Sequence, residues 1–208
     1  MIQYPHKYTQ VFMADTEGSG LVIYDSSRKL MCRVESDYMK PTNPHFSVAG
    51  QNFTHEGGIY SVTVSGGDLY YAPIAGKELY KIKIRTLLKC PNKERANKQS
   101  KLAFKLSSQT GPMTSVKNVI FYSDISNMSL LGKNVYWNWR KPVVLAQDSE
   151  KLQTIHGLKY SAPWDQLLCF TDRYQLSALD KMNQNKINFR YFEMNLTEIR
   201  AKTNNLFQ

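Results

Sequence analysis

The sequence predicts an all-β fold, specifically a β-propeller, and two observations support this prediction. Short runs rich in β-branched and aromatic residues, separated by Gly, Asn, Asp and Ser, recur along the chain, whereas helical periodicity is hard to find. In addition, one strand-turn-strand layout recurs four times at intervals near fifty residues. A period of this length with several strands in each unit is typical of propeller blades.

Each repeat consists of an apolar strand that ends in a small or acidic residue, a polar turn, and a second strand. The four pairs of segments are 11–15 with 21–25, 69–73 with 79–84, 119–124 with 134–139, and 168–172 with 187–192. Counted from Phe12 to Leu69, Val119 and Leu168, the steps are 57, 50 and 49 residues. The alternative is an all-β protein with loosely even hairpins, but a sandwich would show strands every roughly 8 to 12 residues and no longer period.

We expect residues 1–208 to form a single propeller domain of about four blades, an incomplete ring whose N-terminal blades are missing. Three or four blades do not close a ring, so the natural protein is expected to be longer. The first residues, 1–7, lack the basic start, apolar stretch and cleavage site of a signal peptide. An open ring leaves two blade faces uncovered, which predicts marginal stability and association.

The chain is basic, with 27 Lys and Arg against 17 Asp and Glu and a net charge of +10, which favours an anionic partner. No apolar run is long enough to cross a membrane as a helix, so we expect no membrane partner. A basic run, Lys89 to Lys101, lacks the interleaved aromatic residues that stack on nucleic-acid bases. We therefore favour a solvated loop between blades over a polyanion site, and we expect no nucleic-acid partner.

Little in the sequence indicates catalysis or a cofactor. The four histidines have no partner at a spacing of three or four residues and no nearby carboxylate cluster, so no metal site is expected; they are His6, His45, His55 and His156. No nucleophile motif or phosphate-binding glycine loop is present. The three cysteines are widely separated, so at most one internal disulfide can form and one thiol is left over.

Several segments carry motifs that occur in a fixed order. The run VFMADTEGSGLVIYD (11–25) is followed by MKP (39–41), FSVAG (46–50), GIYSVTVS (58–65), LYYAPIA (69–75), TDR (171–173) and INFR (187–190). Together these segments resemble the yellow and major royal jelly protein family. The chain departs from the family pattern at Gly57, where the family has an acidic residue, and near Tyr136 and Trp137, where a family cysteine is replaced.

The resemblance implies the C-terminal part of a secreted six-bladed propeller. The segments MKPTNP (39–44) and QNFT (51–54) are most similar to the yellow-related salivary proteins of blood-feeding sand flies. That subfamily binds serotonin, catecholamines and histamine and is not known to act as an enzyme. The expected function is therefore sequestration of host biogenic amines by a secreted, non-enzymatic salivary protein that is monomeric at full length. The alternative is a yellow-type protein of cuticle pigmentation or the melanin pathway.

A small aromatic amine needs an apolar slot for its ring, an aromatic face or carboxylate for its ammonium, and hydrogen-bond partners for ring hydroxyls. Propellers place such sites in or near the central channel. We expect ligand contacts from Thr171, taken to end the innermost strand of the last repeat, and from Asn188 and Phe189, with Tyr60 as a weaker choice. Phe189 can equally belong to the core, and Asn188 can equally satisfy a backbone group.

Three sequons predict N-linked glycans if the protein is secreted. Their acceptor residues are Asn52, Asn127 and Asn195.

Overall fold

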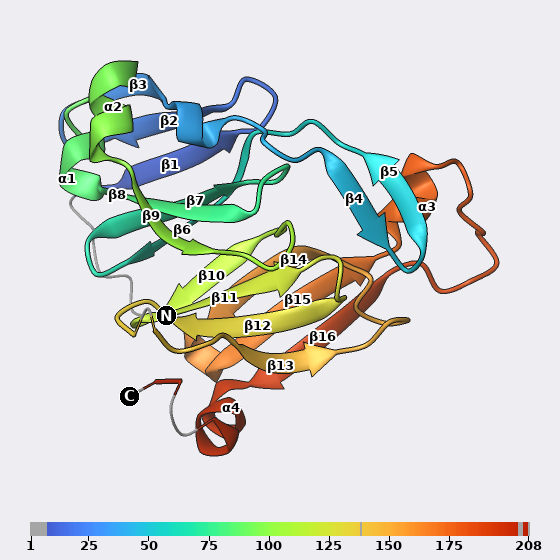
Figure 1. The fold of residues 1–208 in the computed structure, drawn as a ribbon. Coiled ribbons are helices and arrows are strands. Elements are labelled where there is room, and N and C mark those ends of the chain that lie inside the picture. Colours follow the sequence, from blue (N-terminus) through green and yellow to red (C-terminus); the bar gives the residue numbers. More distant parts are fainter. Residues whose placement is uncertain (1–7, 138, 204–205, 208) are drawn as a thin grey trace.

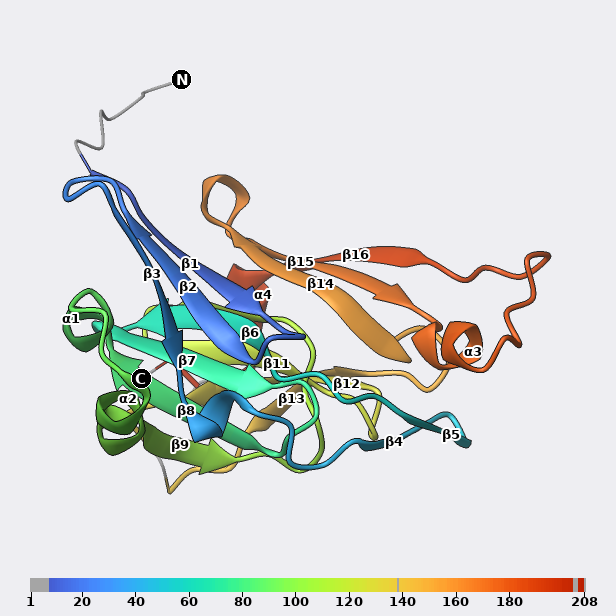
Figure 2. The same cartoon turned by 90° about the horizontal axis from the view of Figure 1, so that it is seen from above.

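A computed structural model describes residues 8–137, 139–203 and 206–207. It shows separate antiparallel sheets that follow one another around a common centre (Figures 1 and 2). The predicted all-β class and the propeller architecture are therefore confirmed. No helix among the described residues is long and apolar enough to span a bilayer.

Four sheets have the form of propeller blades, and a separate hairpin links the first two. The first sheet contains β1 (Gln10–Asp15), β2 (Gly20–Asp25) and β3 (Leu30–Glu35), and the hairpin contains β4 (His45–Val48) and β5 (Gln51–Thr54). The second sheet contains β6 (Ile59–Ser65), β7 (Asp68–Pro73), β8 (Glu78–Lys83) and β9 (Lys101–Lys105). The third sheet contains β10 (Met113–Val116), β11 (Val119–Asp124), β12 (Ser129–Asn134) and β13 (Val143–Gln147). The fourth sheet contains β14 (Thr154–Ser161), β15 (Gln166–Asp172) and β16 (Arg190–Asn195).

Short helices occupy the connections. They are α1 (Ile84–Leu87), α2 (Lys93–Gln99), α3 (Tyr174–Ala178) and α4 (Leu196–Lys202), with the 3-10 turns η1 (Asp37–Met39) and η2 (Ala162–Trp164). The basic run expected to be a loop therefore contains α2, whose first turn is capped by the Asn92 side chain.

Neighbouring sheets contact one another through their first strands. Strand β1 lies against β6, β6 against β10, and β10 against β14. These four strands are therefore the innermost strands, and each sheet runs outward from them. Figure 2 shows the first and fourth sheets as the two ends of this arrangement.

The structure explains the uneven first step of the repeat. Measured between the second strands, from Leu21 to Leu69, Val119 and Leu168, the steps are 48, 50 and 49 residues. The first step came out as 57 because it was counted from Phe12, which lies on the innermost strand β1, to Leu69, which lies on a second strand. The strand expected at 134–139 was wrong, because the partner of β11 is β12, which ends at Asn134. Residues 135 and 136 form a bend, and Asn138 lies outside the described residues.

Hydrophobic clusters fill the space between neighbouring sheets. In β7, Tyr71 packs toward the first sheet and Tyr70 toward the third, because successive side chains point to opposite faces. In β11 of the third sheet, Ile120 packs toward the second sheet and Phe121 packs toward the fourth. Burying each of these side chains contributes about 1.5–3 kcal/mol, so contact between sheets is the main stabilising force.

The three cysteines form one disulfide and leave one thiol, in line with the maximum of one internal disulfide expected from the sequence. Cys32 of β3 forms a disulfide with Cys90, which follows α1, and Cys169 of β15 is a free, buried thiol. Burial raises the pKa of the Cys169 thiol to about 11, so this cysteine stays protonated and acts as an apolar core residue.

Candidate functional site: an aromatic pocket under the hairpin

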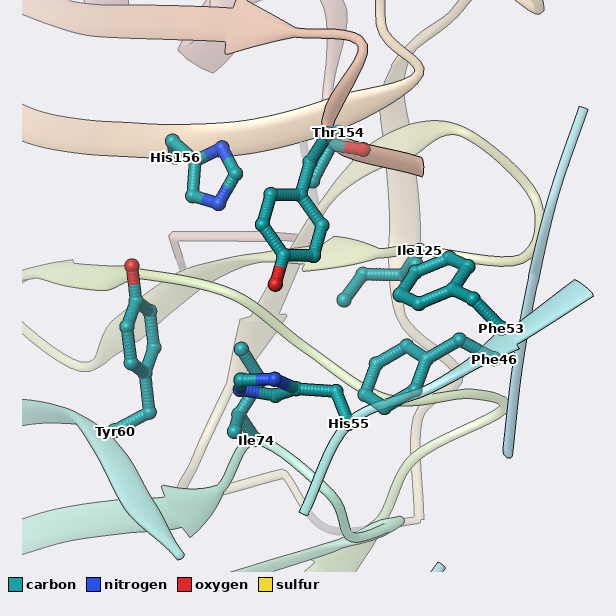
Figure 3. A pocket seen from close by; sticks show the side chains of 9 residues that line it. Phe46, Phe53, His55, Tyr60, Ile74, Ile125, Thr154 and His156 are labelled. Carbon is teal, nitrogen blue, oxygen red and sulfur yellow. The ribbon is translucent and has the colours of Figure 1, made fainter. Parts of the chain in front are cut away.

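A pocket of about 150 Å³ lies where the β4–β5 hairpin meets the ends of the blade sheets (Figure 3). It is lined by Phe46, Phe53, His55, Tyr60, Ile74, Ile125, Thr154, His156 and Tyr174. An apolar cavity of about this size accepts a single benzene-sized ring. The lining is mostly aromatic and aliphatic with a few polar atoms, which is the composition of small-molecule sites.

Backbone contacts fix the hairpin over the second and third sheets. The amides of Thr42 and Asn43 both donate to the carbonyl of Ala75 at 2.7 Å. The Gln109 side chain donates to the carbonyls of Asn43 at 3.0 Å and His45 at 2.8 Å. The hairpin therefore presents its side chains to the pocket from a fixed position.

The hairpin rings form one wall, and Tyr174 of α3 closes it. Phe46 and Phe53, paired across the hairpin, stack with their centroids 5.2 Å apart. Tyr174 lies edge-on to Phe53 at 5.8 Å, to His55 at 6.2 Å and to His156 at 5.3 Å. Tyr174 therefore joins the hairpin to the fourth sheet across the pocket.

The opposite wall carries the polar groups. Tyr60 comes from β6 and His156 from β14, both innermost strands, and Figure 3 shows them apart from the two phenylalanines. Asp172 Oδ2 lies 2.6 Å from His156 Nδ1, and Asp172 Oδ1 accepts the Tyr174 amide at 3.0 Å. Because an ionised carboxylate only accepts hydrogen bonds, Nδ1 of His156 carries the hydrogen.

The negative charge of Asp172 acts on Tyr60, on the same wall of the pocket. Burial, and secondarily the negative charge of Asp172, raise the pKa of Tyr60. The Tyr60 phenol is therefore neutral at physiological pH and can donate or accept a hydrogen bond. The pocket thus combines ring faces, a neutral phenol and a nearby negative charge, features that suit a small aromatic molecule with a positive group.

Of the four residues expected to bind ligand, the structure places only Tyr60 in the lining of this pocket. Thr171 was assigned to an innermost strand, but β15 is the middle strand of its sheet and β14 is innermost. The buried Thr171 hydroxyl donates to the Lys151 carbonyl at 2.7 Å. Strand alternation directs Thr171 away from the face that carries Asp172.

Asn188 and Phe189 lie beyond α3, outside the pocket. The Asn188 amide nitrogen donates to the Asn183 carbonyl at 2.8 Å, and its buried oxygen has no partner among the described residues. Phe189 is 57% exposed and stacks on Phe170 with centroids 5.9 Å apart. Their role in binding stays a prediction.

The sequence did not single out the other aromatic residues of the pocket. The signal that could have found the hairpin rings is the alternation HFSV and QNFT on either side of Ala49 and Gly50, which have the positive φ angles of a turn. The pairing of His156 with Asp172 depends on a bulge in the β14–β15 register, which spacing alone does not reveal.

No cluster of three or more His, Cys, Asp or Glu within the described part of the chain could hold a metal ion. Of the four histidines, His6 lies outside the described residues.

Residues 1–204 match the family model "Major royal jelly protein". The chain belongs to this family. Among curated members, it is similar to major royal jelly protein 7 of Apis mellifera, with 27% identity over 88% of this chain and 46% of that protein. It is also similar to major royal jelly protein 3 of Apis mellifera, with 28% identity over 94% of this chain and 39% of that protein. The chain therefore spans about half the length of the royal jelly proteins it matches.

Solved structures support the fold of this royal jelly family member. The chain is similar to a structure titled Kuenenia stuttgartiensis hydrazine synthase, with a TM-score of 0.52 over 91% of this chain and 43% of that chain. The sequence identity is 9%, so the likeness concerns the propeller fold alone.

Proposed function

We propose that this chain is part of a secreted salivary protein that binds biogenic amines without transforming them, and that the aromatic pocket contributes to the amine site. The observation that carries the proposal is the set of rings around Tyr174, with Asp172 behind His156. The expected ligands are serotonin, catecholamines and histamine, since each combines a small ring with an ammonium group.

The pocket offers each part of such a ligand a complementary group. The volume of about 150 Å³ fits one ring between Phe53 and Tyr60. Ring faces attract an ammonium, and the Asp172 charge adds to this attraction. The Tyr60 phenol can bind a ring hydroxyl. The net charge of +10 opposes a cationic ligand at long range, so added salt should strengthen binding slightly.

Calorimetry with serotonin tests the proposal, on this chain and on the full-length protein. We expect one site with an affinity of roughly micromolar or better, about -8 kcal/mol. Tyr174→Ala should weaken binding at least about ten-fold, because it removes the ring at the centre of the pocket wall. Tyr191→Ala is the matched control, since Tyr191 is 56% exposed on β16 and does not line the pocket.

Two further variants separate the pocket from the site expected from the sequence. If Thr171→Ala and Asn188→Ala abolish binding while Tyr174→Ala leaves it unchanged, the amine site lies with Thr171 and Asn188. If no amine binds to the full-length protein, amine sequestration is wrong.

The pigmentation alternative is favoured by one observation, the hydrogen bond between His156 and Asp172. A histidine held by a carboxylate is an arrangement found in general bases. Conversion of a catecholamine or its oxidised products by the full-length protein, abolished in His156→Gln, would support this alternative over simple binding.

Glycosylation accords with the proposed secretion. Asn52, Asn127 and Asn195 are all exposed. The Asn195 side-chain oxygen caps α4 by accepting hydrogen bonds from the amides of Thr197 and Glu198. The side-chain nitrogen, to which a glycan would be attached, takes no part in this cap. Mass spectrometry of the protein from a secreting cell would show whether these sites carry glycans.

A further inference from the structure

Six exposed basic side chains gather at the outer end of the first and second sheets. We call them the basic face: Arg28, Lys29, Arg85, Lys89, Arg95 and Lys98. They come from the β2–β3 turn, from α1 with the residues after it, and from α2, which Figure 1 shows together at one end of the molecule.

Two links fix these segments to one another. The Arg28 guanidinium donates to the carbonyl of Leu88, just after α1, at 2.5 Å. The disulfide between Cys32 and Cys90 joins β3 to the segment between α1 and α2. The basic face is therefore held in place and is not a set of independent flexible loops.

Helix geometry directs the basic side chains outward. In α1 the buried residue is Leu87 and Arg85 is exposed. Lys89, in the turn that follows the helix, is exposed as well, and its amide donates to the carbonyl of Thr86. In α2 the buried residue is Ala96, while Arg95 and Lys98, three positions apart, are both exposed.

The acidic residues near the basic face leave most of its positive charge without a negative partner. Asp37 binds Lys40 and Lys93, and Asp68 binds Lys81 and Lys83, so both are engaged with other cations. Asp25 is buried, accepts hydrogen bonds from Ser27 and interacts electrostatically with Arg28, so it partly neutralises that one member of the face. The exposed Glu94 is the acid on α2. No ion pair within the described part of the chain involves a member of the basic face.

The surface beside α1 is also concave. A hollow of about 460 Å³ is lined by Gly66, Gly67, Lys83, Ile84, Arg85 and Leu88. Glycines in the β6–β7 turn leave the backbone accessible, and Arg85 connects the hollow to the basic face. A group with negative charge can therefore sit between the turn and the helix.

We propose that the basic face binds a linear sulfated polysaccharide. A chain of repeated sulfate groups complements several separated cations at once. Neither the β2–β3 turn (26–29) nor the segment 84–101 contains an aromatic residue, so the face offers no stacking platform for nucleic-acid bases. Neither segment carries an exposed large apolar side chain that would insert into a membrane.

Heparin immobilised on a surface tests this proposal. The variant Arg85→Ala/Lys89→Ala should weaken binding at least about ten-fold and reduce the dependence of log affinity on log salt by about two. The matched control, Lys159→Ala/Lys186→Ala, removes the same charge from exposed positions outside the basic face and should change binding far less.

Three outcomes would overturn the proposal. Equal losses in both double variants would mean that net charge alone drives binding. Binding to desulfated heparin as tight as to heparin would exclude recognition of sulfate. Tighter binding to single-stranded RNA or to vesicles of anionic lipid would assign the face to another partner. Serotonin binding should be unchanged in the Arg85/Lys89 variant, so this test is independent of the amine proposal.

Discussion

The second and third sheets differ from the first and fourth in how their faces are covered. The middle strands β7 and β11 are buried along their whole length. The corresponding strands β2 and β15 alternate, with Tyr24 37% exposed and Phe170 40% exposed. A blade sheet is therefore fully stabilised only when it has a neighbour on both sides.

The exposed faces of the first and fourth sheets are themselves apolar. The first sheet exposes Met13 and Met31 beside Tyr24, and the fourth exposes Tyr191 and Phe189 beside Phe170. Extended apolar surfaces on sheets favour association. The comparison therefore predicts that stability resides in the central sheets and that association involves the end sheets.

The largest effect is expected from a matched pair of phenylalanine truncations. Phe121 of β11 is fully buried, whereas Phe170 occupies the same second strand of its sheet but is 40% exposed. Phe121→Ala should lower the free energy of unfolding by about 3–5 kcal/mol, and Phe170→Ala by less than about 1 kcal/mol. Urea denaturation measures both, and equal losses would refute the comparison.

Much of the architecture was predictable because a blade repeats its own pattern. Apolar runs such as LYYAP and VIFYS mark strands that are buried on two faces. The regular spacing of these runs predicted the propeller fold. The helices were missed because they are only 4–7 residues long, too short for a 3.6-residue periodicity to emerge.

The pocket was far less predictable, since its residues come from six separate segments. Tyr60 was identified from its motif, but Tyr174 and His156 meet only through the β14–β15 pairing and the start of α3. Such contacts depend on tertiary packing, which local spacing does not encode. The placement of Thr171 failed because a buried middle strand and a buried innermost strand have similar sequences.

A second effect concerns the link between an end sheet and a central one. The disulfide closes a separation of 58 residues, for which chain entropy gives about 4 kcal/mol as an upper estimate. Cys32→Ser/Cys90→Ser should lower stability by up to that amount and speed hydrogen exchange in β1–β3 more than in β10–β13. A reductant should affect the wild type but not the double variant; uniform acceleration across all sheets would contradict a local link.

The smallest effect contrasts two carboxylates and depends on pH. Asp124, at the end of β11, is 4% exposed. Burial alone would raise its pKa, but hydrogen bonds from Ser107, Ser108 and Asn127 outweigh that effect and lower the pKa from 3.8. Asp165, in the connection between β14 and β15 of the fourth sheet, is partly exposed and pairs with Arg200, which together with other hydrogen bonds lowers its pKa.

A carboxylate whose pKa is lower in the folded state stabilises the protein above its unfolded pKa, and this contribution is lost as pH falls through the folded pKa. Asp124→Asn should therefore cost about 1–3 kcal/mol at pH 7, and the cost should shrink below about pH 4. Asp165→Asn should cost less than about 1 kcal/mol, because solvent screens an ion pair whose two side chains are about one third exposed. Urea denaturation at both pH values measures these costs. A larger loss for Asp165→Asn would mean that the fourth sheet, despite its exposed face, depends on its polar contacts as much as the central sheets do.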